Sequence, residues 1–310
     1  MVCLRGRDFI SIADLSRDEI IFLIEETGRL KRTSKEGGLP KPLRDHVVGL
    51  LFEKPSTRTR CSFQSAVYRL GGEAIYMRPE ELQASRGEPV KDTARVLGSY
   101  LDCIIIRTYS QSYLEEFAEY SDAPVVNALS DLEHPTQVIC DLYSIVEAKG
   151  NIKDLKIAWV GDGNNVCNSL LLACGQIGLD LDVACPEEYA PNKTILEIAL
   201  KFSIESGAEI NIVRKPEDAV RDADVVYTDT WVSIGQEKTA QAKVKAFKGY
   251  QVNERLLGFA KDDAVVMHCL PAYRGMEITD SVLEGGRSIV WEQSKNKIYS
   301  AEAILSSIVA

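Results

Sequence analysis

Short apolar runs and stretches of helical periodicity alternate along almost the whole of this chain. The runs are nearly continuous in Val, Ile and Leu, which is typical of strands buried on both faces of a sheet. The stretches between them carry apolar side chains every three to four residues, which predicts helices. Because strands that alternate with helices form βαβ units, the pattern predicts parallel sheets. The expected strands occupy residues 47–52, 73–77, 103–106, 124–128, 157–160, 181–185, 210–213, 225–228 and 265–269.

Four helices are expected from their ends or from their amphipathic pattern. Ser16, followed by Glu19, has the capping-box pattern that predicts the start of the first helix. A helix over residues 57–70 ends at a pair of glycines, and a last amphipathic helix covers about residues 300–309. The long stretch 136–149 is the best candidate for a helix that connects two α/β halves.

The fold class expected from this order is α/β, with two domains that each contain a parallel sheet. A chain of 310 residues is long enough for two domains. We expect residues 1–149 to form the first domain and residues 150–296 the second, with a helix at about 297–310 packing back on the first. The expected architecture has helices that bridge the domains and a cleft between them.

The overall charge excludes some classes of partner. The chain has 36 basic and 46 acidic residues, a formal net charge of −10 at pH 7. Such an excess repels nucleic acids and anionic membranes, so we expect neither as a partner. A local pocket can still be basic.

The cysteines and the N-terminus bear on metals and on location. The eight cysteines are scattered without a C-x-x-C pair, so we predict reduced thiols and no zinc or iron–sulfur site. No basic-then-apolar leader begins the chain, and no uncharged apolar stretch has the length of a membrane helix. We therefore expect a cytoplasmic protein, with no cofactor and no metal.

The strongest chemical signal lies between the strand at 47–52 and the helix that follows it. Parallel sheets bind ligands beyond the carboxyl ends of their strands, and a helix N-terminus offers free amides to an anion. Ser56, Thr57 and Thr59 add hydroxyl groups there, and Arg58 adds a planar fork that matches phosphate oxygens. The alternative is a simple helix cap with solvated arginines. The pattern favours a site for a small anion.

This Ser-Thr-Arg-Thr-Arg segment resembles the carbamoyl-phosphate motif of the aspartate and ornithine carbamoyltransferases. The resemblance extends from about Phe9 to the C-terminus, and further motifs follow in the family's order. They are Gln83 in its loop, Arg107 after an apolar run, H-P-T-Q at 134–137, D-G-N-N at 162–165, D-T-W-V-S-I-G-Q-E at 229–237 and H-C-L-P at 268–271. The resemblance implies two α/β domains and a homotrimer, or a multiple of trimers, with active sites at subunit boundaries.

The resemblance also implies a reaction, the transfer of a carbamoyl group from carbamoyl phosphate to the δ-amine of L-ornithine. The products are L-citrulline and phosphate, and the same chemistry serves arginine biosynthesis and arginine breakdown. Ser56, Thr57 and Arg58 would hold the phosphate, and Thr59, Arg107 and His134 would polarise the carbonyl. Gln137 would form a hydrogen bond with the carbamoyl NH2. The remaining residues that the resemblance implies for carbamoyl phosphate are Gln83, Pro135, Thr136, Cys269, Leu270 and Lys297.

Later loops would bind the second substrate. By resemblance, Asn165, Asp229, Ser233 and the backbone of Ile234 would hold ornithine at its α-amino and α-carboxylate groups. An alkylamine is mostly protonated at pH 7 and cannot attack in that form. Cys269 would lie with Asp229 near the δ-amine, where a carboxylate and a thiolate could accept its proton. Arg107, His134, Cys269 and Asp229 are therefore the expected catalytic residues.

Alternatives remain at the level of reaction and of substrate. The glycine-containing turn at 161–166 also suits a nicotinamide-dependent dehydrogenase, although Val166 stands where a third glycine would be needed. A related binding protein without activity is a second alternative. Within the family, aspartate, putrescine and acetylornithine are alternatives to ornithine, but Asp229 and Cys269 suit an amino-terminated side chain.

Three positions depart from the family pattern. Ile234 replaces a methionine, Tyr273 replaces a histidine, and Lys297 stands where ornithine enzymes usually have an arginine. Lysine keeps the charge but loses the bidentate fork, so we expect weaker affinity for carbamoyl phosphate at that position.

Overall fold

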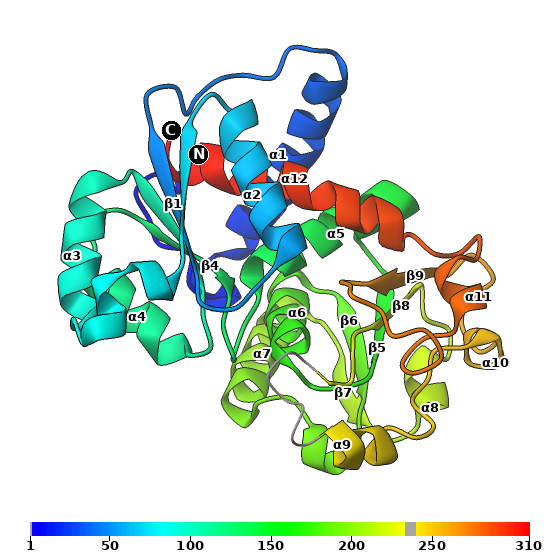
Figure 1. The fold of residues 1–310 in the computed structure, drawn as a ribbon. Helices are drawn as coiled ribbons and strands as arrows, with labels where there is room; N and C mark the ends of the chain where they lie inside the picture. The colour runs from blue at the N-terminus through cyan, green and yellow to red at the C-terminus, as the bar shows by residue number, and fades with distance from the viewer. Residues whose placement is uncertain (1, 233–239) are drawn as a thin grey trace. The chain divides into compact units, whose positions relative to one another are not determined.

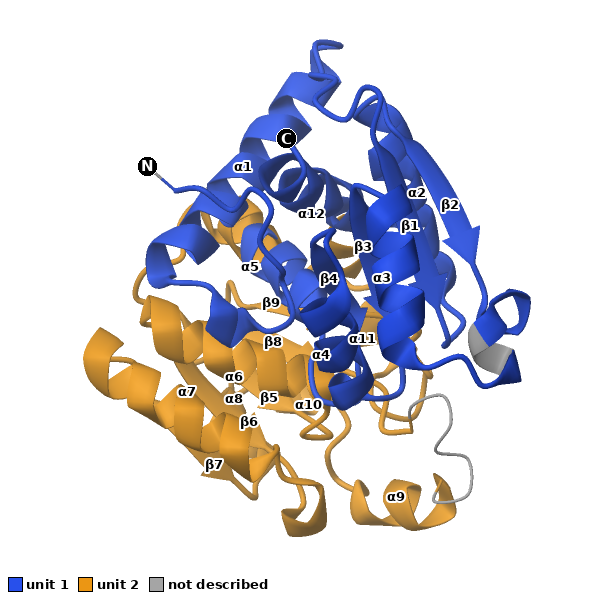
Figure 2. Cartoon of the chain, turned by 90° about the vertical axis from the view of Figure 1, so that its left-hand side faces the viewer, with its two compact units in different colours: residues 1–143, 295–310 blue, residues 144–294 orange. Residues whose placement is uncertain are grey.

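The computed structural model describes residues 2–232 and 240–310, and it divides into two compact units. Unit 1 is Met1–Tyr143 with Lys295–Ala310, and unit 2 is Ser144–Ser294, drawn in blue and orange in Figure 2. Each unit contains one sheet, and all its strand pairs are parallel. The predicted fold class is therefore confirmed.

Unit 1 is built on a four-stranded sheet in the order β2-β1-β3-β4. Figure 1 shows α3 and α4 on one side of this sheet and α1, α2 and α12 on the other. Apolar side chains of the strands, such as Leu51 and Ile104, pack with Phe117 of α4 in a fully buried core. The strands are β1 (Val47–Phe52), β2 (Glu73–Met77), β3 (Cys103–Arg107) and β4 (Val125–Leu129). The helices are α1 (Arg17–Lys35), α2 (Thr57–Arg69), α3 (Val90–Tyr100), α4 (Gln111–Tyr120), α5 (Pro135–Lys149) and α12 (Val290–Ile308), and the unit boundaries fall within the last two.

Unit 2 is built on a five-stranded sheet in the order β7-β6-β5-β8-β9. Its core includes Val160, Val226 and Val266 from the three strands β5, β8 and β9. The strands are β5 (Lys156–Val160), β6 (Asp180–Ala184), β7 (Ile210–Val213), β8 (Val225–Thr228) and β9 (Val265–His268). The helices are α6 (Asn165–Ile177), α7 (Lys193–Ser206), α8 (Pro216–Val220), α9 (Ala240–Ala246), α10 (Glu254–Leu257) and α11 (Asp280–Leu283).

The structure corrects one predicted boundary by about ten residues. The last helix was expected at residues 300–309, but α12 begins at Val290. Its first turns are rich in polar residues, which hides the apolar periodicity, yet Gln293 and Asn296 are buried. These buried polar residues face partners that only the folded chain supplies.

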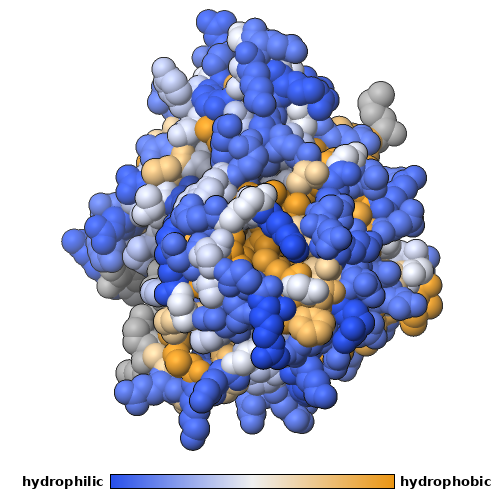
Figure 3. Space-filling view, turned by 90° about the vertical axis from the view of Figure 1, so that its right-hand side faces the viewer, coloured by the Kyte–Doolittle hydropathy of each residue, from blue (hydrophilic) through white to orange (hydrophobic). Residues whose placement is uncertain are grey.

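The polarity of the surface and of the helices can be described separately. Most of the face shown in Figure 3 is hydrophilic, with small hydrophobic patches. Among the described residues, no helix combines the length and the apolar character needed to span a bilayer.

Candidate active site

In unit 1, several predicted site residues follow the carboxyl ends of β1, β3 and β4. The register pairs Phe52 at the end of β1 with Arg107 at the end of β3, and Arg107 in turn with Leu129 of β4. The backbone N–H of Glu53 donates to the carbonyl of Arg107 at 2.8 Å, which ties the first two strand ends together. Carboxyl ends of parallel strands are where such sheets bind ligands.

The first turn of α2 has the groups that an anion-binding site requires. Ser56 is the N-cap, and its hydroxyl accepts a hydrogen bond from the Thr59 N–H at 3.3 Å. The amides of Thr57 and Arg58 belong to the same first turn, where a helix has no internal partners for its N–H groups. Thr59 is buried, whereas Arg58 is half-buried at the start of the helix. This local arrangement follows directly from the sequence. The apolar strand β1 ends at Phe52, and a serine, which favours the N-cap position, stands four residues later at the start of α2.

Arg107 and His134 are both buried, Arg107 at the end of strand β3 and His134 after strand β4 of the unit 1 sheet. Arg107 is 8% exposed as the last residue of β3, and His134 is 5% exposed immediately before α5. Pro135 occupies the first helical position, where a missing N–H costs nothing. The preceding Glu133 is also buried and accepts a hydrogen bond from the Ile12 N–H at 3.1 Å, so the chain entering α5 is held in place.

His134 is a neutral imidazole at physiological pH. Burial lowers the pKa of His134 well below its usual range, and the positive charges of Lys297, Arg107 and Lys54 lower it further. The Thr136 hydroxyl lies 3.5 Å from His134 Nδ1. A neutral imidazole polarises a carbonyl by donating a hydrogen bond, without having to give up its proton.

Gln137 and Lys297 meet although they are far apart in the sequence. Gln137, in the first turn of α5, is 2% exposed, and its Oε1 accepts a hydrogen bond from Lys297 Nζ on α12. The same amide donates from Nε2 to Asp141 at 2.8 Å. Gln83 is different, because it is exposed in a short 3-10 turn, η3 (Gln83–Arg86), and its described contact is with Arg86 at 3.5 Å.

In unit 2, a second group of predicted residues lies at the carboxyl ends of β5, β8 and β9. Asp229 follows β8, and its two carboxylate oxygens accept hydrogen bonds from Asn164 Nδ2 and from the Thr230 N–H, both at 2.7 Å. Asn165 is the first residue of α6 and is half-buried. Asn164 thus positions the carboxylate of Asp229, which the sequence had indicated as a site residue. The role of Asn164 itself was not predicted, because its partner is 65 residues away in the sequence.

The turn before α6 does not suit a dinucleotide. The Asn164 side chain accepts hydrogen bonds from the N–H groups of Val166 and Cys167, at 3.0 and 3.1 Å. Those amides are the ones that would face a pyrophosphate in a dinucleotide-binding turn. Their capture by Asn164 argues against the dehydrogenase alternative.

The H-C-L-P segment follows β9. Leu270 has a φ of 61°, and its N–H donates to His268 Nδ1 at 2.8 Å. Nδ1 is therefore an acceptor, so Nε2 carries the hydrogen and donates to Glu277 at 3.1 Å. Cys269 is half-buried at this turn.

One group of side chains could hold a metal ion. Single ligand atoms of Asp229, His268 and Cys269 all lie within 4.8 Å of one another. Carboxylate, imidazole and thiolate are a donor set that zinc accepts. Both nitrogens of His268 are already engaged in hydrogen bonds, however, so the imidazole would have to leave them to bind a metal.

A buried ion pair lies beside the same turn of unit 2. Burial raises the pKa of Asp162 to about 6, although Lys243 of α9 opposes the shift. The two side chains form a salt bridge of 2.5 Å, and Lys243 is 4% exposed. The expected ornithine ligands Ser233 and Ile234, which precede α9, lie outside the described residues.

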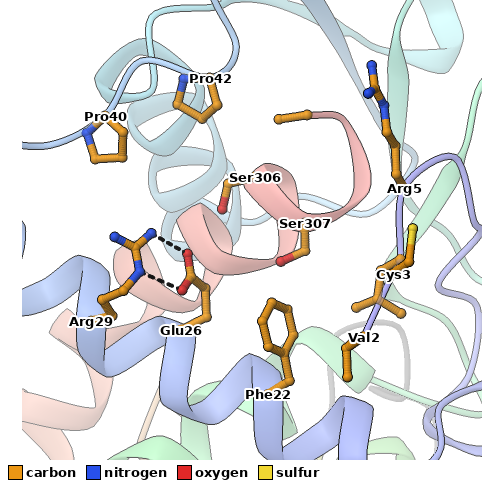
Figure 4. Close-up of a pocket in the computed structure, with 12 residues that line it drawn as sticks. Val2, Cys3, Arg5, Phe22, Glu26, Arg29, Pro40, Pro42, Ser306 and Ser307 are labelled. Carbon is orange, nitrogen blue, oxygen red and sulfur yellow. Dashed lines mark hydrogen bonds and ion pairs between the residues drawn. The ribbon is translucent and has the colours of Figure 1, made fainter.

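A cavity of about 410 Å³ in unit 1 contains none of the predicted site residues. Figure 4 shows it between the N-terminal segment, α1 and α12, with Phe22, Ser306 and Ser307 in its wall. Its Arg29 is paired with Glu26 through two hydrogen bonds of 2.7 and 2.6 Å. The guanidinium is thus paired within the wall of the cavity.

Comparison with known proteins agrees with these features. Residues 7–147 match the family model for the carbamoyl-P binding domain of aspartate/ornithine carbamoyltransferase, and residues 153–308 match the model for its Asp/Orn binding domain. The ornithine carbamoyltransferase of Archaeoglobus fulgidus is 48% identical over 98% of this chain and 97% of its own length. Among solved structures, the ornithine carbamoyltransferase from Pyrococcus furiosus has a TM-score of 0.96 and 42% identity, covering 100% of this chain and 99% of that one. The anabolic enzyme from Campylobacter jejuni has a TM-score of 0.91 and 40% identity, covering 96% and 97%.

Proposed function

This chain belongs to the aspartate/ornithine carbamoyltransferase family, and we propose that it transfers the carbamoyl group of carbamoyl phosphate to the δ-amine of L-ornithine. The products are L-citrulline and phosphate. The observation that carries this proposal is the grouping of the capped α2 N-terminus, buried Arg107 and neutral His134 at the carboxyl ends of one sheet. A small anion with a polarisable carbonyl matches that combination.

Unit 1 residues have the chemistry that carbamoyl phosphate requires. Arg58, with Ser56 and Thr57 at the helix N-terminus, holds the phosphate and stabilises its departure. Arg107, Thr59 and His134 donate hydrogen bonds to the carbonyl oxygen, which gains negative charge as the carbon becomes tetrahedral. Preorganised donors of this kind are worth about 3–4 kcal/mol each in the transition state. His134 suits this role because its neutral ring donates without competing for the amine's proton.

Unit 2 residues have the chemistry that an amino acid with a terminal amine requires. Asp229 is held by Asn164 and presents a negative charge near Cys269, whose thiol lies within 4.8 Å of the carboxylate. The δ-ammonium first gives one proton to the Asp229 carboxylate, and the free amine then attacks the carbonyl carbon. As the C–N bond forms, the nitrogen loses a second proton to the departing phosphate, whose bond to the carbonyl carbon breaks.

Each substrate is assigned to one part of the chain. We assign carbamoyl-phosphate binding to residues 1–149 with 297–310, and ornithine binding to residues 150–296. Asn165, Ser233 and Ile234 are assigned to the α-amino and α-carboxylate groups of ornithine.

The proposed assembly is a homotrimer or a multiple of trimers. Strand β2 lies at the edge of the unit 1 sheet, where its unpaired side can meet another chain. Tyr68 of α2 is 78% exposed and Ile75 of β2 is 48% exposed, which gives this region apolar surface to bury. Light scattering on the purified protein tests the proposal, because it predicts a mass of about three times 34.3 kDa or a multiple of that. A monomer or a dimer would contradict it.

We further assign the enzyme to arginine biosynthesis in the cytoplasm. The similar enzyme from Campylobacter jejuni is described as anabolic, which supports the direction. All eight cysteines are free, which fits a reducing compartment. Growth of an arginine auxotroph that lacks the activity tests the direction, since the expressed chain should restore growth without arginine.

The substrate assignment is tested by a side-by-side kinetic comparison of ornithine, putrescine, aspartate and acetylornithine with carbamoyl phosphate. Ornithine is expected to have the highest kcat/KM, and a preference for any other amine would overturn the assignment. Arg58→Gly should lower citrulline formation about 100-fold or more, because it removes a charged ligand of the leaving phosphate. Arg5→Gly, which removes an exposed arginine outside the site, is the matched control and should leave the rate unchanged. An equal rate in R58G and the wild type would refute the assigned site.

A further inference from the structure

The amide of Gln137 lies between two partners of opposite hydrogen-bonding character. Its Oε1 accepts from Lys297 Nζ, and its Nε2 donates to Asp141 Oδ1 at 2.8 Å. A lysine ammonium can only donate, and an ionised carboxylate can only accept. Both neighbours therefore require the same orientation of the amide, with its oxygen toward Lys297 and its NH2 toward Asp141.

This chain of three side chains is buried throughout. Asp141 is 0% exposed, Gln137 is 2% exposed and Lys297 is 8% exposed. Water cannot compete for the amide at such burial, and a flipped amide would place two donors together at Lys297 and two acceptors together at Asp141. The orientation is thus set by charge and burial together.

The orientation matters for the carbamoyl donor. If the proposed function is correct, the carbamoyl NH2 meets Gln137 and can only donate hydrogen bonds. An amide oxygen has two lone pairs, so Oε1 can accept from the substrate while it accepts from Lys297. Acetyl phosphate has the same shape but carries a methyl group in place of that NH2, so it leaves the oxygen without a donor.

We propose that Asp141 is a positioning residue that sets the preference for carbamoyl phosphate over acyl phosphates, by holding the acceptor oxygen of Gln137 toward the substrate. Asp141 lies one helical turn after Gln137 on α5, at the spacing where side chains of a helix meet. It touches neither substrate in this scheme. Its effect passes entirely through the Gln137 amide, and this proposal rests on the proposed function.

The test measures selectivity as the ratio of Ki for acetyl phosphate, assayed in competition with carbamoyl phosphate, to KM for carbamoyl phosphate. Asp141→Asn keeps the shape but can donate as well as accept, so it removes one of the two constraints on the amide and leaves Lys297 alone to oppose the flipped orientation. We expect D141N to lower this ratio about tenfold, mainly through KM for carbamoyl phosphate, with KM for ornithine little changed. Q137M removes the acceptor and should lower the ratio at least as far.

The double variant distinguishes positioning from a structural role. In the Q137M background, D141N should not change the ratio further, because the amide through which Asp141 acts is gone. Asp224→Asn is the matched control, since Asp224 is a buried carboxylate in unit 2 paired with Lys261 at 2.8 Å. D224N should leave the ratio at the wild-type value even if it lowers the melting temperature.

Two outcomes would overturn the inference. One is an unchanged ratio in D141N, and the other is an equal change on adding D141N to the wild type and to Q137M. If D141N does not fold, Lys297→Met tests the orientation of the Gln137 amide instead. It removes the donor that holds Oε1 in place, so it should also lower the ratio. Failure of the proposed function is a separate result, because the wild type would then form no citrulline at all.

Discussion

At the scale of single residues, the charges around His134 decide how this imidazole can act. Lys297, Arg107 and Lys54 each disfavour a proton on the ring, and burial disfavours it most. A protonated imidazole would add a fourth positive charge to this group. The neutral ring instead offers a hydrogen-bond donor whose strength does not vary with pH over the range in which an amine can attack.

The prediction at this scale concerns the pKa of His134. Lys297→Met removes one cation and should raise that pKa, whereas Lys297→Arg keeps the charge and should leave His134 neutral. The chain has only three histidines, so 15N-histidine NMR with an H134N variant for assignment resolves the ring. In the wild type, the His134 resonances should remain those of a neutral ring from pH 8 down to pH 6. A protonated His134 at pH 6.5 in the wild type would contradict the assigned role.

At the scale of elements, both groups of predicted site residues depend on how a strand passes into a helix. Ser56 caps α2 after β1, and Asn164 caps α6 after β5. The second of these turns packs closely against another segment, because the Gly163 N–H donates to the Tyr189 carbonyl at 2.9 Å. A Cβ on Gly163 would lie 2.3 Å from the backbone nitrogen of Pro191. Only glycine therefore allows this turn to pack against the segment around residue 190.

Gly163→Ala should therefore disturb the turn that carries Asn164 and Asn165. We expect the free energy of unfolding to fall by about 1–3 kcal/mol, because backbone atoms must move apart. KM for ornithine should rise more than KM for carbamoyl phosphate, since the turn belongs to the unit assigned to ornithine. Gly286→Ala is the control, because a Cβ there meets nothing within 4 Å. Denaturant unfolding and steady-state kinetics on both variants check the expectation, and equal behaviour of the two would contradict it.

At the scale of the whole molecule, the net charge of −10 conceals both a basic site and buried acids. Arg107 and Lys297 place positive charge within unit 1, which suits the small anion proposed for this site, whereas the acidic excess of the whole chain repels a long polyanion. Two buried carboxyl groups have pKa values above the ordinary range of a carboxyl group. Burial raises the pKa of Glu302 to about 7, against the opposing effects of Arg69 and Lys41, and raises that of Asp162 to about 6.

These raised pKa values predict how stability depends on pH. Between the ordinary range of a glutamate and pH 7, the folded protein keeps a proton on Glu302 that the unfolded chain has lost. Because the folded state then binds more protons, this group's contribution to the free energy of unfolding falls as pH rises from about 5 to 7.

Glu302→Gln should remove that contribution, so the loss of stability between pH 5 and pH 8 should be smaller than in the wild type. Glu73→Gln, at an exposed position on β2, makes the same change of charge and should leave the pH dependence as it is. Thermal or urea unfolding at several pH values measures the difference. A variant E302Q with the wild-type pH dependence would show that Glu302 does not titrate as stated.

Much of the fold follows from local sequence alone. The run at 47–52 coincides with β1 and that at 225–228 with β8, because uninterrupted Val and Leu residues suit a strand buried on both faces. The segment 56–59 was also predictable, because a strand, a capping serine and a helix are neighbours along the chain. The start of α12 at Val290 was not, since its buried Gln293 and Asn296 look like surface residues until their partners are known.

By itself, then, the sequence determined the strands of both sheets, the ends of several helices and the family, and it predicted which groups meet each substrate. Only the tertiary structure decided the protonation of His134, the orientation of Gln137 and the hold of Asn164 on Asp229. The physical reason is distance along the chain. Strand and cap signals are local, whereas a pKa or an amide orientation depends on charges from elements far apart in sequence, such as Lys297 beside Gln137.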